Sequence, residues 1–220
     1  MAARWPDPEL PLFAEKRIND PRKALKLLAE EARDCTRCDL YKNATKTVFG
    51  EGPADAHMML VGEQPGDQED LTGRPFVGPA GKVLDAALEA AGIERSGVYI
   101  TNAVKHFKNE PRGKRRLHKK PDTREIDICR FWLDNEIEIV RPRIVVALGA
   151  TAARGLMRKS LTVNANRGRV ITLPNGMQAF ITVHPSYLLR LEEERDKRRE
   201  FELLVKDLRL AHEASSRARD

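Results

Sequence analysis

The sequence predicts an α/β fold with three layers, α/β/α, built around a central and mainly parallel sheet of four strands. Two observations support this prediction. Apolar runs typical of buried strands occupy residues 57–63, 98–104, 144–150 and 179–185. Segments with helical spacing lie between or after these runs, at 82–92, 123–140 and 151–159. Strands that alternate with helices pair in parallel and carry helices on both faces of the sheet.

The remaining segments complete one domain, which we expect to span residues 21–216. Residues 1–20 are rich in proline and are expected to form an irregular arm. Apolar spacing predicts a helix over 21–34, and a charged amphipathic pattern predicts a terminal helix over 192–214. The turn signal Pro174-Asn175-Gly176 predicts a short extra strand before it, over 169–173.

Composition excludes several classes of protein. The chain has 220 residues, of which 41% are apolar and 33% charged. No apolar run approaches the roughly 20 residues of a membrane span. The first residues lack the apolar core of a signal peptide, so we expect a cytoplasmic protein without a membrane partner. We also expect a monomer. Three cysteines, an odd number, argue against a disulfide framework.

A basic run over residues 105–124 dominates the charge of the chain. It carries a net charge of +7, whereas the whole chain carries +6, so the rest is close to neutral. Such a concentration favours a polyanionic partner, and nucleic acid is the first hypothesis. The candidate DNA-binding residues are Lys114, Arg115, Arg116, Lys119 and Lys120. Taken alone, however, the run favours a solvated basic loop in which His118 has no chemical role.

Polar and aromatic candidates follow the ends of the predicted strands. Glu63 and Gln64 follow the first strand, Asn102 ends the second, and His184 closes the fourth. The carboxyl ends of parallel strands meet at one edge of a sheet, where sites in such folds gather. Each residue also has a structural interpretation, as part of an exit turn or as a strand-end cap.

The residue types indicate what this edge could bind. The amide of Asn102 offers a donor and an acceptor, which suits the edge of a pyrimidine. His184 could donate to an oxygen that becomes negative on a leaving group. Phe76, in the segment GRPFVGPAGK, could stack on a base, although core packing explains it equally well.

Three thiols and one imidazole form a candidate metal site. The pattern Cys35-x2-Cys38 follows the first predicted helix, and His106 and Cys129 lie far along the chain. Such a set suits zinc, and cysteine ligation also suits an iron–sulfur cluster. A set of buried thiols without metal remains a further alternative.

Taken together, the motifs resemble the uracil-DNA glycosylase superfamily, specifically its iron–sulfur branch. GEQPG, RPFVGPAG, ITNAVK, ICRFWL and VHPSYLLR occur in the order of that family, and the resemblance covers about residues 30–210. The insert GKRRLHKKP resembles the KRRIH loop of the X subgroup, whose members link themselves covalently to DNA. Gln64, where the branch usually has Ala, and His106, where it has a third cysteine, both fit this subgroup. Leu117 departs from the Ile of KRRIH, an apolar exchange of similar volume.

The resemblance implies a role for each matched residue. Phe76 is expected to stack on an extruded uracil, with Asn102 and Gln64 contacting its edge. His184 is expected to stabilise the departing uracil anion, and Glu63 to lie beneath the sugar. His118 is expected to attack C1′ and remain bound there. A [4Fe–4S] cluster is the implied cofactor, and its ligands are Cys35, Cys38, His106 and Cys129.

Three functional hypotheses follow. The first is a single-turnover glycosylase that removes uracil from DNA, with single strands accepted, and becomes linked through His118. The second is an ordinary glycosylase with multiple turnovers, in which His118 only contacts phosphate. The third is a metal-bearing DNA-binding protein without enzymatic activity, which would bind DNA whether or not it contains uracil.

Overall fold

The computed structural model describes residues 19–113, 115–173 and 176–216, and it confirms the predicted α/β class. In these residues the main sheet has five strands in the order β2-β1-β5-β7-β6. Four of them are parallel, namely β1 (Met58–Gly62), β2 (Tyr99–Asn102), β5 (Ile144–Leu148) and β7 (Gln178–Thr182). The predicted extra strand is β6 (Val170–Thr172), which pairs antiparallel with β7 and enlarges the expected four-stranded sheet.

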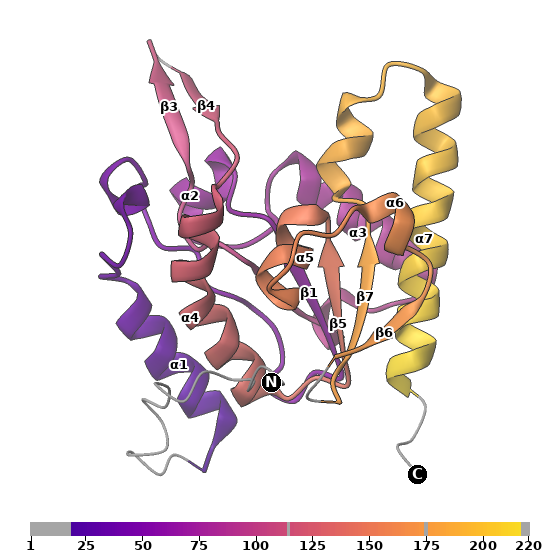
Figure 1. Ribbon diagram of the computed structural model, residues 1–220, viewed down its shortest axis with the longest axis horizontal. Coiled ribbons are helices and arrows are strands. Elements are labelled where there is room, and N and C mark those ends of the chain that lie inside the picture. Colours follow the sequence, from indigo (N-terminus) through magenta and orange to yellow (C-terminus); the bar gives the residue numbers. More distant parts are fainter. Residues whose placement is uncertain (1–18, 114, 174–175, 217–220) are drawn as a thin grey trace.

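Helices cover both faces of this sheet (Figure 1). The longer ones are α1 (Pro21–Ala32), α3 (Pro79–Ala91), α4 (Thr123–Val140), α5 (Ala150–Met157) and α7 (Glu194–Ser216). The shorter ones are α2 (Asp67–Thr72), α6 (Val163–Asn166) and the 3-10 helices η1 (Asp39–Lys42), η2 (Arg95–Gly97) and η3 (Pro185–Arg190). None of the helices in the described ranges is both long and apolar enough to cross a bilayer.

Side chains alternate along the strands, so each face of the sheet has its own core. On one face Leu60 packs among residues of α3 and α7, including Leu84. On the other face Val61 packs among residues of α4 and α5, including Leu133. Outside this layer α1 packs against α4, where Leu28 and Trp132 share a smaller core. The result is the expected three-layer arrangement.

Capping residues explain where the flanking helices begin and end. Asp20 caps α1 by accepting a hydrogen bond from the amide of Arg22 at 2.9 Å. Asp122 and Glu125 form a reciprocal capping box at the start of α4. Gly92 ends α3 with a φ of +74°, which glycine adopts without strain.

The basic run, expected as a loop, forms a hairpin instead. β3 (Asn109–Arg112) pairs antiparallel with β4 (Arg115–His118), and Asn109 lies opposite His118. Gly113, with a φ of +60°, begins the turn, as is favoured in short hairpins. The strands lack apolar alternation, so the pattern gave no strand signal. The hairpin projects from the body at the end of the molecule where β1, β5 and β7 finish (Figure 1).

Lys105 belongs to the core and not to the basic surface. Its side chain is fully buried and forms an ion pair with Glu136 of α4. The reason is local: the chain after β2 stays inside the protein through Phe107 before it emerges in the hairpin. Counting charges along the sequence therefore overstates the positive charge that the hairpin presents.

Some expectations fall on parts of the chain that the structure does not describe. Residues 1–18 of the expected arm, Lys114 among the candidate DNA contacts, and the turn residues Pro174 and Asn175 lie outside the described residues. Gly176, the third residue of that turn, has a φ of +81°.

Candidate active site

The candidate residues of the strand ends do meet, in a cleft of about 1230 Å³. Glu63 and Gln64 enter it from the end of β1, and Asn102 from the end of β2. His184 enters from the residues after β7, and His118 from the end of the hairpin. The cleft is also lined by Phe76, by residues at the start of α5, and by Tyr187, Leu189 and Arg190 of η3.

Asn102 and Phe76 approach each other because residue 62 is glycine. A Cβ at Gly62 would lie 2.3 Å from Oδ1 of Asn102 and 2.6 Å from Cζ of Phe76, both impossible contacts. Phe76 has a φ of 54°, an uncommon backbone conformation for a bulky residue. Oδ1 of Asn102 is buried and has no hydrogen-bond partner among the described residues. A buried acceptor without a partner at the wall of a cleft suits a ligand that donates a hydrogen bond.

His184 is held as a neutral donor. Its Nδ1 accepts a hydrogen bond from the amide of Ser186 at 3.2 Å, so the ring proton lies on Nε2. Burial, and then the charges of Arg190 and His118, lower the pKa of His184 to about 4. The ring of Phe76 lies 5.9 Å away, centroid to centroid. At neutral pH this histidine can therefore donate a hydrogen bond into the cleft without carrying a charge.

The low pKa of His184 predicts an acid-dependent loss of stability. Between pH 6.5 and 4 the unfolded chain binds a proton at this ring that the folded chain does not. The free energy of unfolding should therefore fall, as pH falls through this window, by up to about 1.4 kcal/mol per pH unit from this group. Above pH 6.5 the ring is neutral in both states, so it does not change the free energy of unfolding as pH varies.

Urea denaturation of the parent and of His184→Gln at pH 7 and pH 5 measures this effect. The variant should lose less stability between the two values, and His57→Gln, at an exposed position, is the control. Parallel losses in the parent and in His184→Gln would show that His184 does not titrate differently on folding.

Gln64 joins the hairpin to the end of β1. Its Oε1 accepts a hydrogen bond from the amide of Lys108 at 2.9 Å, and its Nε2 donates to the carbonyl of Lys119 at 2.9 Å. These two backbone partners determine which end of the amide is nitrogen. Nε2 of Gln64 also lies 2.8 Å from Nε2 of His118, so the amide donates to that ring nitrogen. The neutral ring of His118 then carries its proton on Nδ1 and its lone pair on Nε2.

The lone pair of His118 lies beside the carboxylate of Glu63. Nε2 of His118 is 3.5 Å from Oε1 of Glu63, and half of the His118 side chain is exposed to the cleft and solvent. The other carboxylate oxygen accepts a hydrogen bond from the hydroxyl of Thr151 at 2.5 Å. Sequence reasoning missed Thr151. Thr151 directly follows the third predicted strand, so it lies at the same edge of the sheet as Glu63. This position could have identified it as a candidate site residue.

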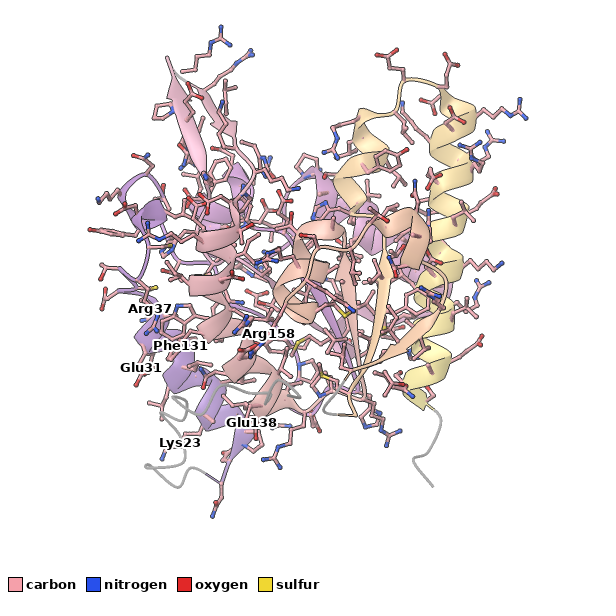
Figure 2. The ribbon with its side chains drawn as sticks, in the orientation of Figure 1. Lys23, Glu31, Arg37, Phe131, Glu138 and Arg158 are labelled. Atoms are coloured by element: carbon pink, nitrogen blue, oxygen red, sulfur yellow. The ribbon has the colours of Figure 1, made fainter. Side chains whose placement is uncertain are left out.

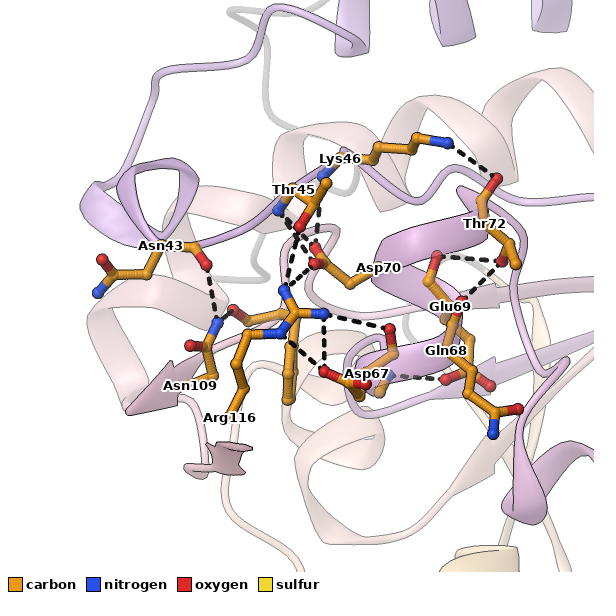
Figure 3. A network of polar contacts seen from close by, with 12 residues as sticks. Asn43, Thr45, Lys46, Asp67, Gln68, Glu69, Asp70, Thr72, Asn109 and Arg116 are labelled. Carbon is orange, nitrogen blue, oxygen red and sulfur yellow. Dashed lines mark hydrogen bonds and ion pairs between the residues drawn. The ribbon is translucent and has the colours of Figure 1, made fainter. Parts of the chain in front are cut away.

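Arg116 anchors the hairpin to α2 (Figure 3). Its Nε donates to Asp67 at 2.7 Å, and Nη1 donates to Oδ2 of Asp70, which is fully buried. Asp70 also accepts hydrogen bonds from the amide of Thr45 at 2.9 and 3.0 Å. The guanidinium lies 5.3 Å from the ring centroid of Phe107. With these partners Arg116 fixes the hairpin over the cleft, and its expected contact with phosphate stays a prediction.

The remaining charges of the run differ in their availability. Lys119 pairs with Glu110 across the hairpin at 2.5 Å, and Lys108 pairs with Glu125 at 2.7 Å. Arg112, Arg115 and Lys120 are exposed and have no ion-pair partner within the described part of the chain. These three side chains are the ones that a polyanion could reach without first displacing an acidic residue.

Three of the four candidate metal ligands gather where α1 packs against α4. Cys35, Cys38 and Cys129 belong to one small core with Trp132. The indole of Trp132 donates to Sγ of Cys35, and the amide of Lys105 donates to Sγ of Cys129, each at 3.1 Å. Burial raises the pKa of Cys129 to about 12. Over the described ranges, no three His, Cys, Asp or Glu side chains are arranged as a site for a metal ion.

His106 nevertheless has a buried ring nitrogen that is free to act as a ligand. The hydroxyl of Thr47 donates to the carbonyl of Arg33, so it accepts from Nε2 of His106 at 2.9 Å. Nδ1 is then left with a lone pair, and it is buried without a partner in the described residues. Burial lowers the pKa of this ring, which keeps it neutral. Arg37, between the two cysteines, covers the ring of Phe131 at 3.9 Å on the outer side (Figure 2).

Comparison with known proteins identifies the family to which this fold and this group of strand-end residues belong. Residues 49–209 match the profile of the Uracil DNA glycosylase superfamily, and the chain belongs to that superfamily. The predicted family resemblance is therefore confirmed at this level.

Among the curated relatives, the type-4 uracil-DNA glycosylase of Thermotoga maritima is 41% identical over 167 residues, which cover 76% of this chain and 83% of the relative. That of Sulfurisphaera tokodaii is 35% identical over 198 residues, covering 83% and 87%. A type-5 uracil-DNA glycosylase of Pyrobaculum aerophilum is 33% identical over 205 residues, covering 78% and 87%. Placement in the X subgroup is not tested by these matches and stays a prediction.

Proposed function

We propose that this protein removes uracil from DNA and then remains covalently bound to the abasic site through His118. The relatives named uracil-DNA glycosylases support the first half of this proposal. One observation carries the second half: Nε2 of His118, with its lone pair, lies in the same cleft as Asn102 and His184 and 3.5 Å from the carboxylate of Glu63.

Each residue of the cleft has a task in bond cleavage. A base must leave the helical stack, or arrive single-stranded, before it can enter such a cleft. Phe76 then offers a ring to stack on, and the unpartnered Oδ1 of Asn102 accepts from N3–H of uracil. The bond between C1′ and N1 breaks, and its electron pair leaves with uracil. His184 donates from Nε2 to the oxygen that becomes negative, and Glu63 stabilises the positive charge that develops on the sugar.

The lone pair of His118 completes the reaction. The hydrogen bond from the amide of Gln64 to Nε2 breaks, and Nε2 forms a bond to C1′. The proton on Nδ1 is released from the resulting imidazolium, while the uracil anion takes up a proton from solvent. A nucleophile that the hairpin holds beside C1′ has a very high effective concentration relative to water. Alkylated imidazole is a poor leaving group, so the bond persists and each protein molecule reacts once.

Gln64 has a different task in this proposal from the one implied by the resemblance. Its amide already binds Lys108, Lys119 and His118, so it holds the nucleophile in place. A contact between Gln64 and uracil, which the resemblance implies, stays a prediction.

Release of the base tests the glycosylase proposal directly. The protein is incubated in excess with single-stranded DNA that contains one uracil, and free uracil is quantified by chromatography. We expect about one uracil per DNA molecule, and none from the matched oligonucleotide with thymine. DNA binding without release of uracil would favour the non-enzymatic alternative.

Cytoplasmic location and a monomeric state stay predictions from the sequence.

We further propose that Cys35, Cys38, His106 and Cys129 hold a [4Fe–4S] cluster. The buried, unpartnered Nδ1 of His106 supports this assignment. So does the gathering of three thiols in one core. The ligands of such a cluster bind different iron atoms, so they need not converge as the ligands of one ion do. When bound, the cluster would act as a structural crosslink between α1, the segment after β2, and α4.

The purified protein is therefore expected to contain iron and to absorb broadly near about 400 nm. Cys129→Ser should lose both the iron and the absorbance, because a ligand is removed from the most buried position of the set. Elemental analysis with one zinc and no iron per chain would contradict the cluster assignment.

DNA binding is expected to depend on salt through the exposed cations of the hairpin. Neutralising Arg115 or Lys120 with glutamine should flatten the slope of log K against log salt by about 0.7–0.9 for each phosphate that the protein no longer neutralises. Lys23→Gln, an exposed site on α1 at the opposite end of the molecule, should leave the slope unchanged (Figure 2). An unchanged slope in both hairpin variants would show that the hairpin does not contact DNA.

A further inference from the structure

A fully buried ion pair lies beneath the strand end that carries Asn102. The side chains of Lys105 and Glu136 are both 0% exposed, and Nζ of Lys105 lies 2.5 Å from Oε2 of Glu136. Burying two charges is costly, and apolar residues of similar volume often stabilise a core equally well. What the pair contacts therefore indicates what it does.

Every hydrogen-bonding atom of the pair is in use. Besides Glu136, the ammonium donates to Oγ1 of Thr101 at 2.7 Å and to the main-chain carbonyl of Asn102 at 2.8 Å. The carboxylate accepts from the hydroxyls of Thr101 and Tyr99 and from the amide of Gly50, at 3.0–3.1 Å. An ammonium has three donors, and all three of Lys105 are therefore satisfied.

The contact with Asn102 reaches the binding cleft through one peptide group. Side chains alternate along β2, so Tyr99 and Thr101 face α4 while Asn102 lines the cleft. On the side of β1, the amide of Ala103 donates to the carbonyl of Gly62 at 2.9 Å. On the side of α4, only Lys105 holds the carbonyl of Asn102 among the described residues.

We propose that Lys105 and Glu136 are positioning residues, which orient the peptide of Asn102 so that its side chain meets uracil correctly. This inference rests on the proposed function. Oδ1 of Asn102 has no partner of its own in the described residues, so backbone geometry determines where it points. Uracil offers N3–H to that oxygen, whereas cytosine has a lone pair at N3. A displacement of the amide by about 1 Å can reduce a rate by about 10²-fold.

A double substitution separates positioning from stability. Lys105→Met/Glu136→Leu replaces the pair by apolar groups of similar size, which buried ion pairs often tolerate without loss of stability. Tyr99→Phe is the matched control, because it removes a hydrogen bond to the same carboxylate and leaves the contact between Lys105 and Asn102 in place. Circular dichroism and thermal unfolding verify that each variant folds.

The measurement is single-turnover release of uracil from single-stranded DNA over a range of protein concentrations. We expect the double variant to reduce the maximal rate constant by about 10- to 100-fold with the half-saturating concentration unchanged. Tyr99→Phe should keep the parent rate. If the double variant does not fold, Lys105→Met/Glu136→Gln is used instead, because it removes the donor to Asn102 and leaves a neutral amide oxygen that can accept from Tyr99. It is compared with Tyr99→Phe in the same way and should show the same loss of rate.

Two results would overturn the inference while the proposed function stands: a folded double variant that releases uracil at the parent rate, or a Tyr99→Phe that loses as much rate as the double variant. A parent protein that releases no uracil would instead overturn the proposed function, and this inference with it.

Discussion

His118→Ser is expected to abolish the covalent adduct and to leave release of uracil largely intact. Cleavage of the glycosidic bond depends on Asn102, His184 and Glu63, and the substitution leaves all three side chains in place, although it removes the ring that lies 3.5 Å from Glu63. Trapping depends on a nucleophile within reach of C1′. Serine is too short and too weakly nucleophilic to replace imidazole, and the space it leaves admits water. Adduct yield should therefore fall by at least about 10²-fold, while abasic product accumulates over several turnovers.

Lysines of the hairpin are poor substitutes for the missing imidazole. Lys119 is paired with Glu110, and exposed lysine side chains are protonated at neutral pH. A matched variant, Lys119→Gln, should therefore retain the adduct. An adduct that survives in His118→Ser would identify another residue as the nucleophile. Loss of uracil release in that variant would mean that His118 acts during cleavage itself.

Glu63→Gln is expected to reduce release of uracil by about 10²- to 10³-fold, which is the scale of one electrostatic contact to a transition state. The substitution keeps the shape and the hydrogen bond with Thr151, since the amide oxygen can still accept from that hydroxyl. Only the negative charge beside the developing sugar cation is removed. Folding and binding of uracil-containing DNA should persist.

Single-turnover kinetics measure the reduction in Glu63→Gln. Glu200→Gln is the control, because Glu200 lines the same cleft but pairs with Arg167 and not with His118. The control should stay near the parent rate. Equal rates in Glu63→Gln and in the parent would remove Glu63 from the mechanism.

The sequence predicted the layers of the fold and the edge of the sheet that holds the site, because both follow from local patterns. Buried strands are continuous apolar runs, and parallel strands necessarily bring their carboxyl ends together. Glu63, Asn102 and His184 could therefore be placed at one edge from the order of the residues alone. The structure confirms that these three residues line one cleft.

Contacts between distant segments could not be predicted in this way. The hairpin lacks apolar alternation, and its position depends on Arg116 reaching Asp67 and Asp70, 49 and 46 residues away. The hydrogen bonds between the side chain of Gln64 and the backbone of Lys108 and Lys119 likewise join segments that are far apart in the sequence. Each of these contacts depends on how the hairpin packs against α2 and the end of β1. A hydrophobic periodicity in the sequence does not predict that packing.

Lys105 shows the opposite error, in which a local pattern misleads. Along the sequence it begins a basic run, and it is counted in the net charge of +7 that favours a polyanionic partner. In space it is paired inside the core, where Glu136 supplies the counter-charge from 31 residues away. The net charge of a segment counts all of its charged side chains, whereas only the exposed ones can contact a ligand.

The most direct test of the central claim is the mass of the product formed with DNA. The parent protein is mixed with a single-stranded oligonucleotide that contains one uracil, heated in detergent, and examined by denaturing electrophoresis and intact mass spectrometry. We predict a heat-stable species whose mass is that of the protein plus the oligonucleotide minus one uracil, and whose cross-linked peptide carries the sugar on His118. Free abasic DNA without such a species would contradict covalent trapping and leave an ordinary glycosylase.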